Sequence, residues 1–204
     1  NVKNVLAGVE FDVKLDDDKG KCHIIAIFDA KENDYEKIED KINQDLLTAK
    51  EDFYTKDRFR NILVNIGLNT ILIASQTKSI SNIENLHNAL NDSTDDVQKI
   101  LKVKYINALE FQKSKVEGIL LNDLKKMDIR TALITGSDCH DWNVYPNHDV
   151  NNIKSNFHFS EAKMLPTFKG LLMAVTSPTS RFSCNRNDNS VISNISINNI
   201  DIPI

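Results

Sequence analysis

Short apolar strands that alternate with amphipathic helices constrain this chain more than any other feature. Residues 69–76, NTILIASQ, and residues 130–140, RTALITGSDCH, contain continuous runs of apolar and β-branched residues, which are typical of buried strands. Residues 34–50, 56–66 and 114–127 instead carry apolar side chains at helical spacing. This alternation predicts an α/β fold with a mostly parallel sheet, and it leaves an open sheet and a closed barrel as alternatives.

The first 30 residues add an antiparallel element to this pattern. Residues 5–15 and 22–30 are predicted strands, and the turn sequence DDDKGK lies between them. If the hairpin turns between residues 16 and 17, Glu10 and His23 lie opposite one another. A carboxylate and an imidazole on one face of a hairpin are residue types that bind metal ions.

A second acid and imidazole follow the late apolar run, in the sequence ALITGSDCHDW. If the strand continues to His140, Asp138 and His140 point to the same face and Cys139 points to the other. Such a pair at the end of a buried strand suits zinc, manganese or iron better than calcium. A purely structural role for these two residues stays open. Asp-x-His is a short motif, and a strand histidine is more often a hydrogen-bonded structural residue than a metal ligand.

Composition narrows the class of protein. The 204 residues carry a net charge of -4, which argues against a broadly basic surface for nucleic acid. No apolar run approaches the roughly 20 residues that span a bilayer, so we expect no membrane partner. Three cysteines without CxxC spacing favour free thiols and a cytoplasmic location.

Three pieces in order, VLAGVEFDV, CHIIAIFD and ITGSDCHD, resemble the PHP domain, the phosphoesterase domain named for polymerases and histidinol phosphatase. The resemblance implies a distorted β/α barrel, here incomplete, with mostly parallel strands and an N-terminal hairpin. It also implies that a divalent metal, Zn, Mn or Fe, is held by Glu10, His23, Asp138 and His140. Bound metal would activate water for attack on a phosphate ester or a nucleic-acid phosphodiester.

The stretch EAKMLPTFKGLLMAVTSPTSRF is similar to TrlF-like proteins, in which a PHP domain precedes an SMC/AAA-type ATPase. We therefore expect residues 1–184 to form a PHP-like domain, and residues 185–204 to be a linker and the first strand of that ATPase. ATP would enter only through this downstream domain, which would also be the main partner. The first family motifs, His-x-His and Asp-His, are expected before Asn1 in a longer protein.

The resemblance and the strand pattern also indicate secondary site residues, and one of these positions weakens the expectation of activity. Lys163 is expected to contact phosphate, with a solvated surface lysine as the equal alternative. Glu110 ends a predicted strand, at residues 106–111, and is a further site candidate. Ser75 stands where the family usually has a histidine, which weakens a full multi-metal site. The resemblance thus implies a phosphoesterase module, expected to have little activity alone, or else a degenerate module with a structural or regulatory role beside the ATPase.

Overall fold

The computed structural model describes residues 4–14, 22–48, 50–76, 106–111, 114–126, 128, 130–147 and 159–183. Their strands are β1 (Gly8–Lys14), β2 (Cys22–Phe28), β3 (Tyr54–Thr55), β4 (Thr70–Gln76), β5 (Ala108–Phe111), β6 (Ala132–Thr135), β7 (Glu161–Ala162) and β8 (Phe182–Ser183). Their helices are α1 (Tyr35–Asn43), α2 (Lys56–Ile66), α4 (Ser114–Lys126), α5 (Phe168–Thr176) and α6 (Pro178–Arg181), with short 3-10 turns η1 (Glu32–Asp34) and η2 (Trp142–Val144).

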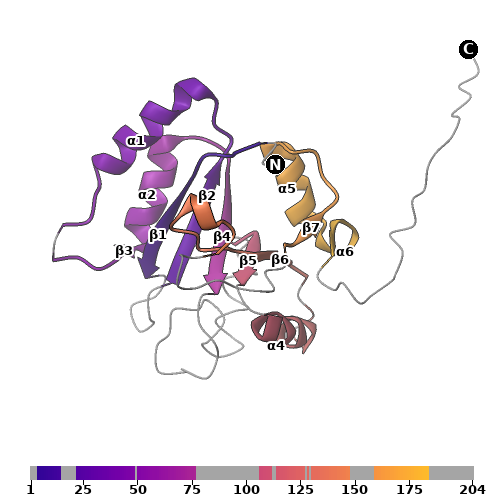
Figure 1. Ribbon diagram of the computed structural model, residues 1–204. Coiled ribbons are helices and arrows are strands. Elements are labelled where there is room, and N and C mark those ends of the chain that lie inside the picture. Colours follow the sequence, from indigo (N-terminus) through magenta and orange to yellow (C-terminus); the bar gives the residue numbers. More distant parts are fainter. Residues whose placement is uncertain are drawn as a thin grey trace, which may run out of the picture.

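A six-stranded sheet in the order β3-β1-β2-β4-β5-β6 forms the centre of the fold (Figure 1). β1 and β2 pair antiparallel, as do β2 and β4, whereas the other neighbours pair parallel. β2 is therefore the one strand of this sheet that runs against the rest. The predicted α/β class, the mostly parallel sheet and the N-terminal hairpin are confirmed. In the described residues the sheet is open, with β3 and β6 at its edges, and it is not a closed barrel.

Each face of the sheet packs a separate apolar core. Alternate strand residues such as Phe11 and Ile24 face α1, α2 and α4, which contribute Ile38, Ile62 and Leu120. The opposite face packs on α5 through a second cluster: Ile71, Ile73, Ala108, Ala132, Phe168 and Val175. Figure 1 shows α1 and α2 on one side of the sheet and α5 and α6 on the other. The period of two in the strands thus produces a three-layer arrangement.

Local sequence explains most helix ends. α2 begins where the Thr55 hydroxyl accepts a hydrogen bond from Arg58 N, and it ends at Gly67, whose φ of 69° favours glycine. α1 is shorter than the predicted helix of residues 34–50, because it ends at Asn43. α5 begins after Thr167, whose hydroxyl accepts a hydrogen bond from Gly170 N, and it ends at Thr176, two residues before Pro178. Pro178 is the first residue of α6, a position where a helix needs no N–H donor.

Several predictions from the sequence fall on residues that the structure does not describe. These are the helices expected between residues 81 and 105, the linker of residues 185–190 and the final strand. Among the described residues, no helix combines the length and the apolar character needed to cross a membrane.

Candidate functional site

Four of the polar residues singled out in the sequence lie at one end and on one face of the six-stranded sheet: Glu10, His23, Ser75 and Glu110. The carboxyl ends of β1, β4, β5 and β6 lie at the same end of the sheet as the start of β2, because only β2 runs the other way. We call this end of the strands the carboxyl edge, to distinguish it from the outer strands β3 and β6. In register, Asp12 pairs with His23, and Ser75 pairs with Glu110. Ile24 pairs with Ala74, so His23 and Ser75 are the next positions on those two strands. A polar row therefore crosses four neighbouring strands.

The hairpin brings two carboxylates onto one imidazole. His23 Nδ1 lies 3.1 Å from Glu10 Oε1 and 2.8 Å from Asp12 Oδ1. The Asp12 Oδ1 atom is buried, and the His23 side chain is 28% exposed to solvent. Phe11 and Val13, which alternate with the two acids, are buried in the core on the opposite face. Sheet alternation therefore holds Glu10 and Asp12 together on the polar face.

The predicted hairpin register is wrong by two residues. Glu10 pairs with Ile25, and the residue directly opposite His23 is Asp12. A shift of two keeps every side chain on its original face, so Glu10 still reaches His23 along the diagonal. Asp12 is the site residue that sequence reasoning missed. Its position two residues after Glu10 in a strand was the available signal.

The second acid and imidazole lie in a loop, which corrects the prediction of an extended strand to His140. β6 ends at Thr135, and Asp138 has a φ of 50°, in the left-handed region that aspartate tolerates better than most residues. His140 Nδ1 lies 3.0 Å from the Asp138 carbonyl oxygen and 3.9 Å from Asp138 Oδ1. Side-chain exposures of 42% for Asp138 and 63% for His140 leave both accessible to a substrate.

Glu110 connects the polar row to this loop. It is a buried charged residue, 9% exposed, at the end of β5. A Cβ built on Gly136 would lie 1.3 Å from Glu110 Oε1, so the carboxyl group fills the space that a side chain would need. Gly136 N also donates to the Phe111 carbonyl oxygen at 3.1 Å. Glycine at position 136 therefore permits the loop to leave β6 directly across a buried acid.

Lys163 and Trp142 lie at the surface of the molecule, outside the polar row. Lys163 is exposed beside the β7–β8 pair, where its N–H donates to the Arg181 carbonyl oxygen at 2.7 Å and its own carbonyl accepts from Arg181 Nη1 at 2.9 Å. Trp142 begins η2 and is 78% exposed, because the chain turns away from the sheet at Gly136.

The hairpin gathers more potential metal ligands than the loop pair does. Glu10 Oε1 and Asp12 Oδ1 lie 3.1 and 2.8 Å from the same atom, His23 Nδ1, and carboxylate and imidazole are ligand types for zinc, manganese or iron. As the side chains lie, no group of three or more His, Cys, Asp or Glu in the described part of the chain is arranged to hold an ion. β4 and β5 lie between β2 and β6, which separates those two strands by about 14 Å at roughly 4.8 Å a step.

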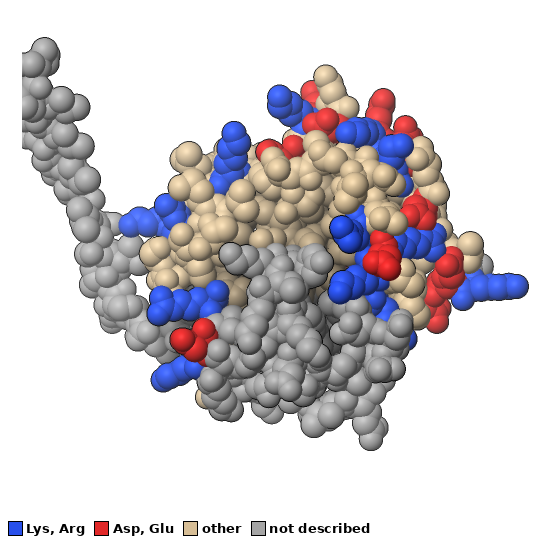
Figure 2. All heavy atoms as spheres, turned by 180° about the vertical axis from the view of Figure 1, so that it is seen from behind, with Lys and Arg blue, Asp and Glu red and all other residues tan. Residues whose placement is uncertain are grey.

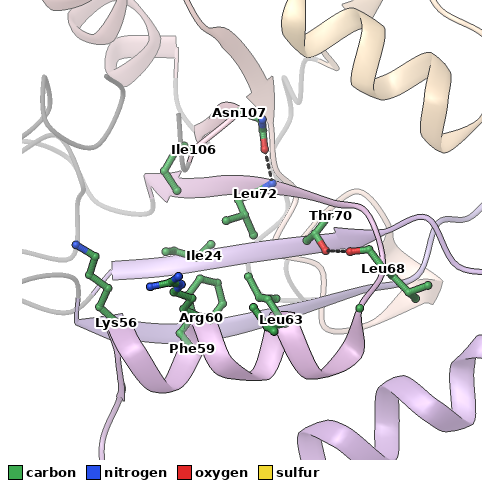
Figure 3. A pocket seen from close by; sticks show the side chains of 12 residues that line it. Ile24, Lys56, Phe59, Arg60, Leu63, Leu68, Thr70, Leu72, Ile106 and Asn107 are labelled. Carbon is green, nitrogen blue, oxygen red and sulfur yellow. Dashed lines mark hydrogen bonds between the residues drawn. The ribbon is translucent and has the colours of Figure 1, made fainter. Parts of the chain in front are cut away.

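A cavity of about 480 Å³ lies on the other face of the sheet (Figure 3). α2 forms one wall with Phe59 and Leu63, and Leu72 comes from the sheet. The basic groups of Lys56 and Arg60 lie at one end of it. Its described lining includes no carboxylate and no imidazole, so this cavity lacks metal-binding chemistry.

Comparisons of the chain with protein-family models, with curated proteins and with solved structures found no match.

Proposed function

We propose that the chain is a PHP-like, metal-dependent phosphoesterase module acting on phosphate esters or nucleic-acid phosphodiesters. The observation that carries the proposal is the convergence of Glu10 and Asp12 on His23 at the carboxyl edge of the sheet. Chemistry in α/β folds gathers at this edge, because loops there present side chains from several strands. The order of the motifs along the chain supports the same assignment.

Glu10, Asp12 and His23 are not arranged around an ion as they lie, so their side chains would have to move to hold zinc, manganese or iron. When bound, such an ion lowers the pKa of a coordinated water and offsets charge on phosphate oxygens. His23 would need to turn an unprotonated Nδ1 toward the ion, so binding would release any proton held there. Asp138 and His140, accessible at the same edge, would contact the phosphate group or a second ion.

A downstream ATPase is part of the same proposal. The similarity of residues 185–204 to the start of an SMC/AAA-type domain supports it, and those residues lie outside the described part of the chain. In this arrangement ATP binds the downstream domain and governs access to the phosphoesterase edge.

A non-catalytic module with a structural or regulatory role is the second candidate. Two observations favour it: Ser75 occupies the position beside Glu110 in register, and two strands separate β2 from β6. A serine hydroxyl is a weak ligand compared with imidazole. A hairpin that binds one ion without the loop pair would keep a structural metal and lack the multi-metal clamp of hydrolysis.

Metal titration with matched variants tests both candidates. We expect the chain to bind Mn²⁺ or Zn²⁺ in calorimetry, and His23→Ala or Asp12→Asn to weaken binding by about tenfold or more. Glu39→Gln, on the exposed surface of α1, is the carboxylate control and should bind as the unmodified chain does. Unchanged affinity in both site variants would eliminate the hairpin as a metal site.

Hydrolysis of bis(p-nitrophenyl) phosphate separates the two candidates. The phosphoesterase predicts metal-dependent release of p-nitrophenol that His23→Ala and His140→Ala both reduce. Metal binding with no release, in the chain and in the longer protein with its ATPase, would support the non-catalytic module.

A further inference from the structure

Three aromatic side chains form an exposed patch beside the loop of Asp138 and His140. They are Trp142, Tyr145 and Phe159, which are 78%, 42% and 48% exposed, and we call them the aromatic patch. The rings of Trp142 and Tyr145 stack with centroids 5.4 Å apart and planes 29° apart. Tyr145 and Phe159 follow at 6.1 Å and 35°. Exposed aromatic rings grouped in this way commonly mark a binding surface.

Hydrogen bonds fix the patch in place from both sides. Asp141 Oδ1 accepts from the Asn143 N–H and from Asn143 Nδ2, each at 2.9 Å, which caps η2 and sets Trp142. On the other side, Ser160 and Thr135 exchange two hydrogen bonds of 2.7 Å between backbone N–H and hydroxyl groups. Phe159 is thereby held next to the end of β6. A surface ordered before binding loses little entropy when a ligand arrives.

The position of the patch relates it to the candidate phosphate chemistry. Trp142 follows His140 by two residues, and Ser160 holds Phe159 at the carboxyl end of β6. This is the edge at which His23 and Glu110 also lie. A ligand that placed a phosphate at this edge could therefore extend a planar group over the rings.

The area of the aromatic patch and the net charge of the chain distinguish between a protein partner, a polyanion held by bulk charge and a stacked base. A stable protein interface buries about 800 Å² per partner, which three partly exposed rings do not approach. The face drawn in Figure 2 mixes Lys and Arg groups with Asp and Glu groups, and the whole chain carries a net charge of -4. Bulk attraction to a polyanion is therefore weak, whereas base stacking needs only an exposed aromatic face.

We propose that the aromatic patch stacks an unpaired nucleobase of single-stranded nucleic acid whose phosphate occupies the candidate site. This inference rests on the proposed function, because the phosphate site at that edge comes from it. The base stacks on the exposed ring of Trp142. Tyr145 stacks against Trp142, and Phe159 lies against Tyr145.

Trp142 is the single tryptophan of the chain, so its fluorescence reports on the patch directly. The chain is titrated with oligothymidylate and with an abasic deoxyribose-phosphate oligomer of the same length, at one salt concentration. Stacking predicts strong quenching by oligothymidylate and little by the abasic oligomer. Equal quenching by both oligomers, or none by either, would overturn the inference. A fluorescence change that depends only on protein concentration would also overturn it, and would indicate a protein interface.

Variants provide the second measurement, by anisotropy of a labelled oligothymidylate. Trp142→Ala should weaken binding about tenfold or more. Tyr35→Ala removes an aromatic residue of α1 that is 49% exposed, and it should leave binding unchanged. Equal effects of the two variants would contradict a stacking role. Metal-dependent hydrolysis without base-dependent quenching would refute the stacking site and leave the proposed function standing. Base-dependent quenching without hydrolysis, in the chain and in the longer protein, would support the stacking site and the non-catalytic module.

Discussion

The hairpin and the loop after β6 each carry an acid two residues from another polar site residue, yet their positions are determined differently. Glu10 and Asp12 meet His23 because the ladder between β1 and β2 fixes their alternation and pairing. Asp138 and His140 lie two residues apart in one turn after the sheet has ended, and their side chains approach to 3.9 Å. A pair set by a ladder is held by many backbone hydrogen bonds, whereas a pair in a loop depends on a few local contacts.

The difference between the hairpin pair and the loop pair depends most on Gly136, where the chain leaves the sheet. Gly136→Ala would place a Cβ 1.3 Å from Glu110 Oε1 and 2.7 Å from Glu110 Cγ, so the buried carboxyl group or the loop must move. We expect the free energy of unfolding to fall by about 1–3 kcal/mol. Urea unfolding followed by far-ultraviolet circular dichroism measures this loss.

Gly118→Ala is the matched control for that substitution. An added Cβ at Gly118 meets nothing within 4 Å on the exposed side of α4, so alanine should stabilise the helix by up to about 1 kcal/mol. The double variant Gly136→Ala, Glu110→Ala should recover part of the loss, because the clash is removed. A double variant that is less stable than Gly136→Ala alone would show that the Cβ meets a different obstacle.

Removing each imidazole in turn compares the two pairs directly. His23→Ala takes away the nitrogen 2.8 Å from the buried Asp12 Oδ1, and we expect a loss of about 1–2 kcal/mol. His140→Ala removes a side chain that is 63% exposed, and its effect should stay within about 0.5 kcal/mol. Both are measured by urea unfolding without added metal. Similar losses would mean that the loop pair is as firmly integrated as the hairpin pair.

The same contrast explains which parts of the site the sequence could predict. Strand periodicity placed Glu10 and His23 on one face, and a register error of two residues left that result intact. The exact pairing depends on where the chain reverses between β1 and β2, and the sequence DDDKGK of residues 16–21 allows several turn centres. Asp12 was therefore missed as the residue opposite His23, although the alternation with Glu10 indicated its face.

The loop pair shows where periodicity stops being informative. Asp138 and His140 were predicted to share a face only because the strand was assumed to continue past Gly136. Tertiary packing ends β6 at Thr135, where the buried Glu110 side chain lies against Gly136. No local pattern reveals that a glutamate 26 positions earlier in the chain fills this space. The exposure of Trp142 follows from the same departure of the chain from the sheet.

Glu117 sharpens the comparison, because it is an acid with neither a ladder partner nor a turn partner. Its Oε1 atom on α4 is buried and has no hydrogen-bond partner in the described structure, and burial raises the pKa of this carboxyl group above 4.5. A raised pKa means that the folded state disfavours the charged form. Stability associated with Glu117 is therefore complete below pH 4.5 and is lost as the pH rises through the folded-state pKa.

Glu117→Gln should consequently raise the free energy of unfolding at pH 7 and have little effect at pH 4. The gain is on the order of a few tenths of a kcal/mol, since partial exposure screens the charge. Urea unfolding at both pH values measures it, and Glu39→Gln on exposed α1 should show no such difference. A gain of equal size at pH 4 and pH 7 would assign the effect of Glu117→Gln to amide hydrogen bonding instead of charge.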